Sequence, residues 1–185
     1  GGAAAGRAGY AREKLCPGGS FVAWEKFGGR RRACRTGGGR VPRGKENLPV
    51  KPKELLSLAV EAMGHAYVPY SGYCVGAALL CADGSVYQGC NIENASYTPT
   101  ICAERNAFFK AVYDGKRDFS AIAVVGGKDG VISGIFPPCG VCRQVMREFC
   151  RDDFLIYMGG PEGSYETHTL AEMLPFGFSA SQHMK

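Results

Sequence analysis

The spacing of hydrophobic and polar residues becomes regular just after residue 50. Leucine and alanine residues then recur at the intervals of one helix face, which predicts an amphipathic helix over 52–66. Pro52 suits the first turn of such a helix. The pattern breaks at residues 69–72, where proline and glycine favour a turn or loop.

Two apolar runs, 75–81 and 86–92, flank the turn dipeptide Asp83-Gly84 and predict a β-hairpin. After the hairpin, helical and strand-like compositions alternate. The further predicted elements are helices at 102–112 and 139–149, a short helix at 170–174, and short buried strands at 121–125 and 154–157. Strands that alternate with helices after an antiparallel hairpin indicate an α/β protein whose mixed sheet is covered by helices on its faces.

The first fifty residues have a different composition. They contain 12 of the 27 glycines and hold 11 Lys/Arg against 3 Asp/Glu, which leaves 11 against 14 for residues 51–185. Such a segment buries too little apolar surface to offset its ordering entropy. We therefore expect residues 1–50 to be a disordered, basic tail that is inert or artefactual, and residues 51–185 to form the folded domain. Nucleic-acid binding by the tail is the less favoured alternative.

Cysteine usage bears on the compartment and on the chemistry. The chain has nine cysteines and no apolar run as long as a signal sequence or a membrane span. We expect reduced thiols, a cytoplasmic location and no membrane partner. In a reducing compartment, spaced cysteines more often bind metal or react than form disulfides. The cysteines expected to be only small buried hydrophobes are Cys74, Cys81, Cys90 and Cys150.

Two segments together contain the parts of a hydrolytic zinc site. Zinc in such sites takes three protein ligands and keeps a fourth position for water, and Cys102, Cys139 and Cys142 can supply the three. A Cys-x-x-Cys pair alone also fits a structural zinc site or a redox pair. However, the chain has no second such pair, and a redox pair does not require Cys102-Ala103-Glu104. A glutamate two residues after the first ligand is typical of zinc deaminases.

The residues beside the ligands suggest how the negative charge of the site is balanced. Each ligand segment is predicted to begin a helix, where unpaired N–H groups and the helix dipole stabilise thiolates. Three thiolates on Zn²⁺ still leave a net charge of −1, which opposes ionisation of a water ligand. Arg105 and Arg143 are placed to donate hydrogen bonds to sulfur, and Arg105 is favoured. Glu104 is expected to carry protons from the water to the ring nitrogen and the departing amine.

Longer motifs carry a specific resemblance. They are Asn91-Ile92-Glu93-Asn94-Ala95, Ile101-Cys102-Ala103-Glu104-Arg105 and Pro138-Cys139-Gly140-Val141-Cys142-Arg143-Gln144, with Tyr67-Val68-Pro69-Tyr70-Ser71 and Val75-Gly76-Ala77-Ala78-Leu79 in support. Over residues 51–178 the chain resembles the small cytidine deaminase family. The resemblance implies a three-layer α/β/α sandwich with a mixed sheet and one zinc per subunit. It also implies hydrolysis of cytidine and deoxycytidine to uridine and deoxyuridine, with release of ammonia, in pyrimidine salvage.

The resemblance also assigns roles to particular residues. Asn91 and Glu93 match the positions that hold the ribose 3′-hydroxyl. The backbone of Ala103 and the carboxylate of Glu104 would read the edge of the pyrimidine. Tyr73 stands where the family usually has a phenylalanine that packs on the base, and Cys74 where a proline is common, so the substrate range is left open.

Assembly is implied in the same way. Tyr70 and Phe178 match aromatic positions that help to complete the sites of neighbouring subunits in a homotetramer. Taken singly, each aromatic residue equally fits simple core packing.

Two other functions stay open at this point. One is a related deaminase, acting on another aminonucleoside, an antibiotic or a nucleic acid. Editing deaminases usually carry His-Ala-Glu and need a cationic track for the strand, whereas residues 51–185 are slightly acidic, which disfavours nucleic acid as a partner. The other is a zinc-stabilised scaffold that binds RNA through its basic tail.

Overall fold

The computed structural model describes residues 48–180 and residue 184. The predicted tail, 1–50, therefore lies almost wholly outside the described residues. At its end, Leu48 and Val50 pack against the hydrophobic core on the side of the first helix. The part of the chain that joins the core thus begins slightly before residue 51.

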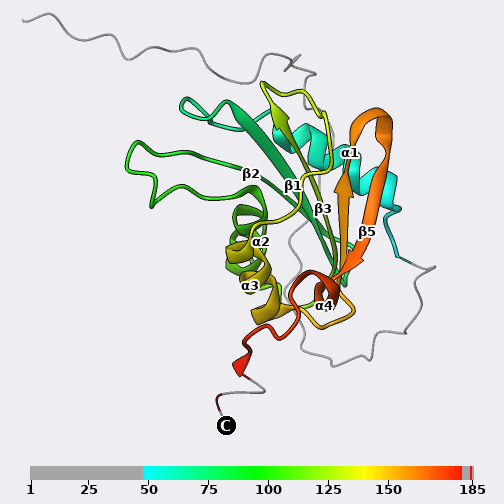
Figure 1. The fold of residues 1–185 in the computed structure, drawn as a ribbon. Helices are drawn as coiled ribbons and strands as arrows, with labels where there is room; N and C mark the ends of the chain where they lie inside the picture. Colours follow the sequence, from blue (N-terminus) through cyan, green and yellow to red (C-terminus); the bar gives the residue numbers. More distant parts are fainter. Residues whose placement is uncertain (1–47, 181–183, 185) are drawn as a thin grey trace, which may run out of the picture.

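A five-stranded mixed sheet forms the centre of the molecule (Figure 1). Its strands are β1 (Tyr73–Cys81), β2 (Val86–Cys90), β3 (Phe119–Lys128), β4 (Leu155–Gly159) and β5 (Tyr165–Thr169), in the order β2-β1-β3-β4-β5. β3 and β4 are parallel, because a helix crosses between them, and the other neighbouring strands are antiparallel. The predicted hairpin is the β1–β2 pair.

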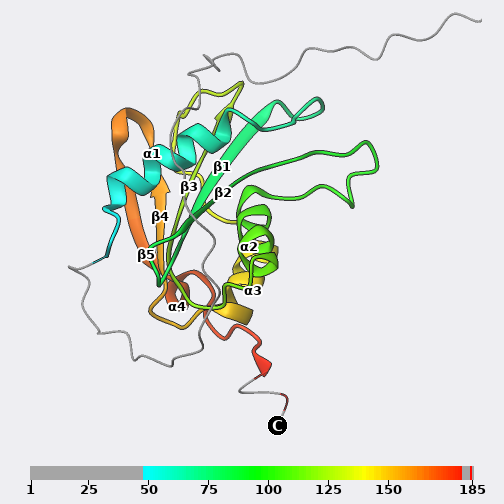
Figure 2. The same ribbon diagram turned by 180° about the vertical axis from the view of Figure 1, so that it is seen from behind.

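Helices cover both faces of this sheet. The helices are α1 (Pro52–Met63), α2 (Ala103–Tyr113), α3 (Gly140–Phe149) and α4 (Leu170–Met173), with a 3₁₀ turn at Pro161–Gly163. α1 lies on one face and α2 and α3 lie on the other, as Figures 1 and 2 show from opposite sides. The predicted three-layer α/β/α fold is confirmed.

The continuous apolar run of β1 follows from burial on both faces. Ala77 and Leu79 belong to the core cluster under α2 and α3, whereas Ala78 and Leu80 belong to the cluster under α1. All four side chains are fully buried. A strand covered on both faces shows no polar alternation, which is why this segment reads as uniformly hydrophobic.

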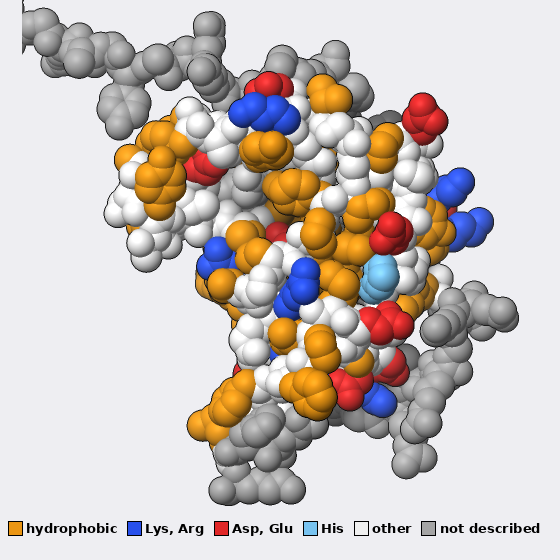
Figure 3. Space-filling view, viewed as in Figure 1, with side chains coloured by type: hydrophobic (Ala, Val, Ile, Leu, Met, Phe, Trp, Pro, Cys, Tyr) orange, Lys and Arg blue, Asp and Glu red, His pale blue; other side chains and the backbone are white. Residues whose placement is uncertain are grey.

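The face that carries α2 and α3 is only partly covered. Figure 3 views this face and shows hydrophobic side chains gathered across its middle. The half-buried side chains that pack against the underlying core cluster include Ile135, Phe136, Met173 and Leu174. Apolar surface of this kind is a candidate contact for another protein surface.

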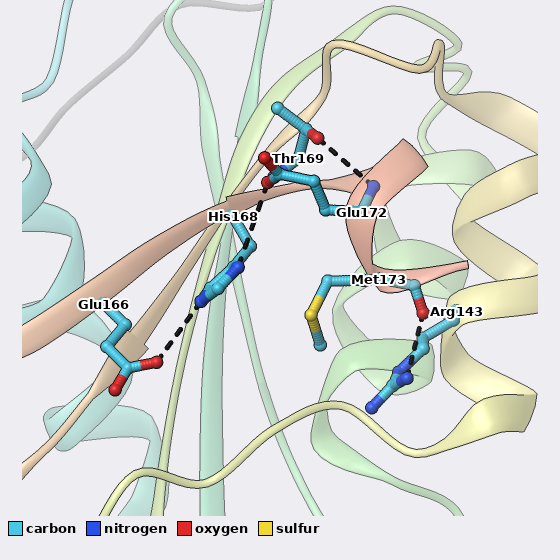
Figure 4. Close-up of polar contacts among 6 residues, drawn as sticks. All are labelled: Arg143, Glu166, His168, Thr169, Glu172 and Met173. Carbon is cyan, nitrogen blue, oxygen red and sulfur yellow. Dashed lines mark hydrogen bonds and ion pairs between the residues drawn. The ribbon is translucent and has the colours of Figure 1, made fainter. Parts of the chain in front are cut away.

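Several elements differ from the sequence-based prediction. Strand β3 is longer than the predicted strand at 121–125, and β2 ends at Cys90 rather than at residue 92. The helix predicted over 52–66 ends at Met63, because residues 64–65 form a turn, although Ala66 is buried as its spacing implied. Strand β5 was not predicted, since its sequence is polar and it forms an edge whose pairing with β4 comes from the backbone. The short helix α4 follows β5 directly, and the Thr169 and Glu172 side chains cap its start (Figure 4).

Most described cysteines are free thiols, as expected. Cys81 and Cys150 are buried, and Cys90 is half-buried. Cys74 is also buried, but it is disulfide-bonded, so the expectation of reduced thiols was wrong for this residue. None of the helices in the described ranges is long and apolar enough to cross a membrane.

A glycine in β2 sets how closely α2 approaches the sheet. A Cβ atom at Gly89 would lie 2.4 Å from the Ala103 carbonyl oxygen and 2.5 Å from the Ala107 nitrogen. Both atoms belong to the α2 backbone, which cannot yield as a flexible side chain could. The first turn of α2 therefore rests directly on the β2 backbone.

We expect Gly89→Ala to destabilise the fold by about 1–3 kcal/mol, because the added methyl group pushes α2 off the sheet. Chemical denaturation measures this free energy of unfolding. Gly134→Ala is the matched control, since a Cβ atom at Gly134 meets nothing within 4 Å. Equal stability of the two variants would contradict this account of the helix–sheet contact.

Candidate active site

Three cysteine sulfurs meet at the start of α2 and α3. Cys102 and Cys139 are the N-cap residues of α2 and α3, and Cys142 lies in the first turn of α3. Their Sγ atoms lie within 4.8 Å of one another, with 3.8 Å between Cys102 and Cys139 and 3.6 Å between Cys139 and Cys142. Within the described residues, this is the group of three potential ligands that could hold a metal ion.

The spacing of the sulfurs fits zinc. A tetrahedral zinc ion with Zn–S bonds of about 2.3 Å holds neighbouring sulfurs about 3.8 Å apart. The measured separations of 3.6 and 3.8 Å agree with one triangular face of that tetrahedron. The three cysteines therefore fit three ligand positions, and the fourth position would remain open.

The Cys102 sulfur lies in an environment that favours negative charge. Hydrogen bonds from Cys142, Arg105 and Cys139, together with the Arg105 charge, lower the pKa of the Cys102 thiol to about 5 against the opposing effect of burial, and Cys142 is the largest cause. The pKa of Cys142 is raised, because its thiol donates to Cys102 and is buried. Both helix starts also direct unpaired N–H groups toward this point.

Glu104 is a buried carboxyl group beside the sulfurs. It lies in the first turn of α2 and is only 4% exposed. Burial raises its pKa to about 7, the negative charge of Cys102 also raises it, and the Glu104 backbone amide, Cys142 and Arg105 act in the opposite direction. A carboxyl group that exchanges its proton near neutral pH is suited to general acid–base work.

The two arginines next to the ligands have different contacts. Arg105 Nη2 lies 3.5 Å from Cys102 Sγ and 3.2 Å from the Thr100 carbonyl oxygen. Arg143 instead donates to the carbonyl oxygens of Pro138, at 2.7 Å, and Met173, at 2.9 Å (Figure 4). Arg143 thus ties the loop before Cys139 to α4, a role that its sequence context did not reveal.

Asn91 and Glu93 follow β2 and hold the segment that leads into β1. The Asn91 side chain accepts from the Val75 N–H and donates to the Tyr73 carbonyl oxygen, both at 2.8 Å. Glu93 Oε2 accepts from the backbone N–H groups of Tyr70, at 3.0 Å, and Ser71, at 3.2 Å. Both side chains therefore organise residues 70–75.

The charge state of Glu93 follows from these contacts. Burial would raise its pKa, but the Ser71 side chain, the two backbone amides and the Lys128 charge together lower it below the ordinary value. Glu93 is accordingly a carboxylate at neutral pH. Its neighbour Ile92 pairs with Ile101 through two backbone hydrogen bonds of 3.0 Å, which brings this segment to the residue before Cys102.

Tyr73 begins β1 and has two side-chain neighbours that the sequence did not single out. Its ring centroid lies 6.4 Å from that of Phe136, and Lys128 Nζ lies over the ring at 5.2 Å. Tyr73 itself is 46% exposed. The pairing of Tyr73 with Lys128 across β1 and β3 depends on the sheet register, so no local pattern could have revealed it.

The remaining predicted site residues lie at the protein surface or in the core. Ala103 is fully buried in the first turn of α2. Tyr70 is 49% exposed and its ring lies 6.1 Å from that of Tyr97. Phe178 is 55% exposed, and its carbonyl oxygen accepts from Gln144 of α3 at 2.8 Å. Simple core packing therefore does not account for Tyr70 or Phe178 in this chain.

Known proteins resemble this chain in sequence and in fold. The family model described as the Cytidine and deoxycytidylate deaminase zinc-binding region matches residues 49–158. A cytidine deaminase of Sporosarcina psychrophila is 50% identical over 127 residues, which cover 69% of this chain and 90% of that protein. A cytidine deaminase of Halalkalibacterium halodurans is 52% identical over 126 residues, which cover 68% of this chain and 92% of that protein.

A solved structure agrees with these sequence matches. The crystal structure of a cytidine deaminase from Burkholderia pseudomallei has a TM-score of 0.63 to this chain at 43% sequence identity. The alignment covers 67% of this chain and 96% of that one. With its zinc-binding region, its fold and its cysteine cluster in agreement, the chain belongs to the cytidine and deoxycytidylate deaminase family.

Proposed function

We propose that this protein is a zinc-dependent deaminase that hydrolyses cytidine and deoxycytidine to uridine and deoxyuridine and releases ammonia. The observation that carries the proposal is a buried, protonatable glutamate beside three convergent cysteine sulfurs. Zinc held by Cys102, Cys139 and Cys142 would supply a Lewis acid that activates water for attack on the amino-bearing ring carbon. Proton transfer, charge balance and nucleoside binding are carried out by residues of the chain.

Glu104 is the proton carrier in this proposal. Its carboxylate accepts a proton from the attacking water and delivers it to the ring nitrogen. It then accepts the remaining proton of the hydroxyl group that has bonded to the ring carbon and delivers it to the amino group, which leaves as ammonia. Its burial supports this role, because a pKa of about 7 lets one group serve as base and then as acid. The first turn of α2 holds it at a fixed place beside the sulfurs.

Arg105 offsets the excess negative charge of the three thiolates. Its Nη2 atom lies 3.5 Å from Cys102 Sγ, so it withdraws electron density from that ligand. Its Nε atom is buried and has no hydrogen-bond partner within the described part of the chain. Arg105 is half-buried, so its guanidinium gives up part of its solvation to remain beside the ligand.

The nucleoside is bound at the opposite end of the site. Asn91 and Glu93 hold the ribose 3′-hydroxyl, since the amide keeps a second N–H and the carboxylate keeps further lone pairs beyond those used on residues 70–75. The Ala103 backbone and Glu104 read the pyrimidine edge. The Tyr73 ring packs against the base, and its partial exposure leaves surface for that contact.

Exposed aromatic side chains support a homotetramer whose sites are completed by neighbouring subunits. The aromatic side chains of Tyr70 and Phe178 are about half exposed, and that of Phe176 is fully exposed. Hydrophobic side chains also gather on the face shown in Figure 3. Aromatic surface of this kind is typical of a protein interface.

The state of the cysteines bears on the cellular compartment in which the protein works. Six of the seven cysteines in the described ranges are free thiols, with Cys74 the exception, and this predominance suits a reducing cytoplasm. Turnover of free nucleosides there would serve pyrimidine salvage. A nucleic-acid substrate is disfavoured, because residues 51–185 hold 11 Lys/Arg against 14 Asp/Glu.

Glu104→Gln should lower turnover of cytidine by about 10²- to 10⁴-fold, because the amide cannot carry protons. Zinc content, measured by atomic emission, should stay at that of the parent. Turnover is followed by the ultraviolet absorbance change of cytidine. Glu148→Gln is the control, since Glu148 is an exposed glutamate of α3. An active Glu104→Gln variant would refute the proton-carrier role.

Substrate identity is decided by a panel of free cytidine, an aminonucleoside antibiotic and a cytosine-containing oligonucleotide. We expect free cytidine to have the highest kcat/KM, because Asn91 and Glu93 engage the sugar of a nucleoside. An oligonucleotide turned over as well as cytidine would favour an editing deaminase. Antibiotic turnover without cytidine turnover would retain the zinc chemistry and replace the substrate.

Shared sites predict complementation between two inactive variants. A Glu104→Gln chain still supplies Phe178, and a Phe178→Ala chain still supplies Glu104. Subunits that are mixed, partly dissociated and reassembled should therefore regain activity well above the sum of the separate variants. Analytical ultracentrifugation of the parent should give the mass of four chains. Absence of any gain after proven subunit exchange would mean that each chain forms its site alone.

A further inference from the structure

Lys128 lies beside the sugar-binding end of the site but has no role in the proposed chemistry. It is the last residue of β3 and stands directly opposite Tyr73 in the register of β1 and β3. Its Nζ atom donates to the Ser71 carbonyl oxygen and lies 5.2 Å from the centroid of the Tyr73 ring. An exposed lysine is usually free in solvent, so convergent contacts of this kind need a reason.

Lys128 and Glu93 both form hydrogen bonds with the backbone of Ser71. The Ser71 carbonyl oxygen accepts from Lys128, whereas the Ser71 N–H donates to Glu93 Oε2 at 3.2 Å. The adjacent Tyr70 N–H donates to the same carboxylate oxygen at 3.0 Å. A cation and an anion are thus linked through one residue of the loop. The Lys128 charge is also among the groups that lower the pKa of Glu93.

The loop formed by residues 70–72 packs closely against the end of β3. Gly72 has a φ of +68°, and a Cβ atom there would lie 3.0 Å from both Lys128 Nζ and Asp129 Oδ1. The Asp129 N–H donates to the Gly72 carbonyl oxygen at 2.8 Å. The Lys128 ammonium is therefore packed against the loop backbone, where a lysine side chain gives up rotamer freedom.

We propose that Lys128 is a positioning residue for the nucleoside, which fixes Ser71 and the Tyr73 ring and so holds Glu93 in place to accept the sugar 3′-hydroxyl. This inference rests on the proposed function, because it takes Glu93 as the residue that binds that hydroxyl. It makes the site selective for nucleosides that carry a 3′-hydroxyl group. A compact ammonium suits the task, since it can cover the ring and reach the carbonyl together.

The test compares two substrates that differ only in the 3′-hydroxyl, deoxycytidine and 2′,3′-dideoxycytidine. Lys128→Met removes the charge and keeps most of the stem. We expect its KM for deoxycytidine to rise about tenfold, with kcat within about twofold of the parent. The inhibition constant of dideoxycytidine should change less than about twofold, since this nucleoside lacks the group that Glu93 binds.

Two variants separate positioning from general structural damage. Lys128→Arg keeps the charge and should recover part of the lost affinity. Lys110→Met is the matched control, because Lys110 Nζ also donates to a backbone carbonyl, that of Gln88 at 2.6 Å, in a different part of the fold. We expect parent-like KM for Lys110→Met, and parent-like zinc content and melting temperature for all three variants.

Several outcomes would overturn the inference. They are an unchanged KM in Lys128→Met, an equal weakening for both nucleosides, or a fall in kcat together with loss of zinc. If the parent protein did not turn over deoxycytidine, the proposed function would be refuted instead. In that event, calorimetry measures the binding of both nucleosides to the parent and to Lys128→Met. If Lys128→Met bound deoxycytidine as tightly as the parent does, the inference would be refuted as well.

Discussion

The site depends on the meeting of two helix starts at one point beside the sheet. Cys102 and Cys139 occupy the N-cap positions of α2 and α3, and their sulfurs are 3.8 Å apart. Two positive helix ends brought this close repel each other unless negative charge lies between them. Thiolates formed on metal binding would provide that charge, and the same electrostatics would then allow the two helices to converge. The glycine contact between β2 and α2 then fixes the distance of α2 from the sheet.

The charges around the cluster are balanced one against another. Three thiolates with one divalent ion leave a surplus negative charge, and Arg105 lies against Cys102 to offset it. A permanently ionised carboxylate beside the cluster would add to the surplus. Burial and the Cys102 charge instead raise the pKa of Glu104 to about 7, so its proton remains available near neutral pH. The environment that stabilises the ligands therefore also tunes the proton carrier.

Features fixed by local sequence could be predicted, and features fixed by distant pairing could not. The ligands and Glu104 follow from short spacings, because each lies at or next to a helix start. Strand β5 escaped prediction, since backbone pairing with β4 rather than apolar side chains forms it. The end of α1 at Met63 was missed because Ala66 keeps the helical spacing and is buried in another conformation.

The two ends of the site therefore differ in how they are specified. The metal end is built from segments that carry their own geometry, whereas the proposed sugar end is assembled from β1, β3 and the segment after β2. The Ile92–Ile101 bridge joins the two ends, because it leads from Glu93 directly to the residue before Cys102. Changes at the sugar end can alter which nucleoside fits while the chemistry at the metal end persists. Tyr73 belongs to the proposed sugar end, and its ring is supported by Phe136 and Lys128 rather than by the metal-binding helices.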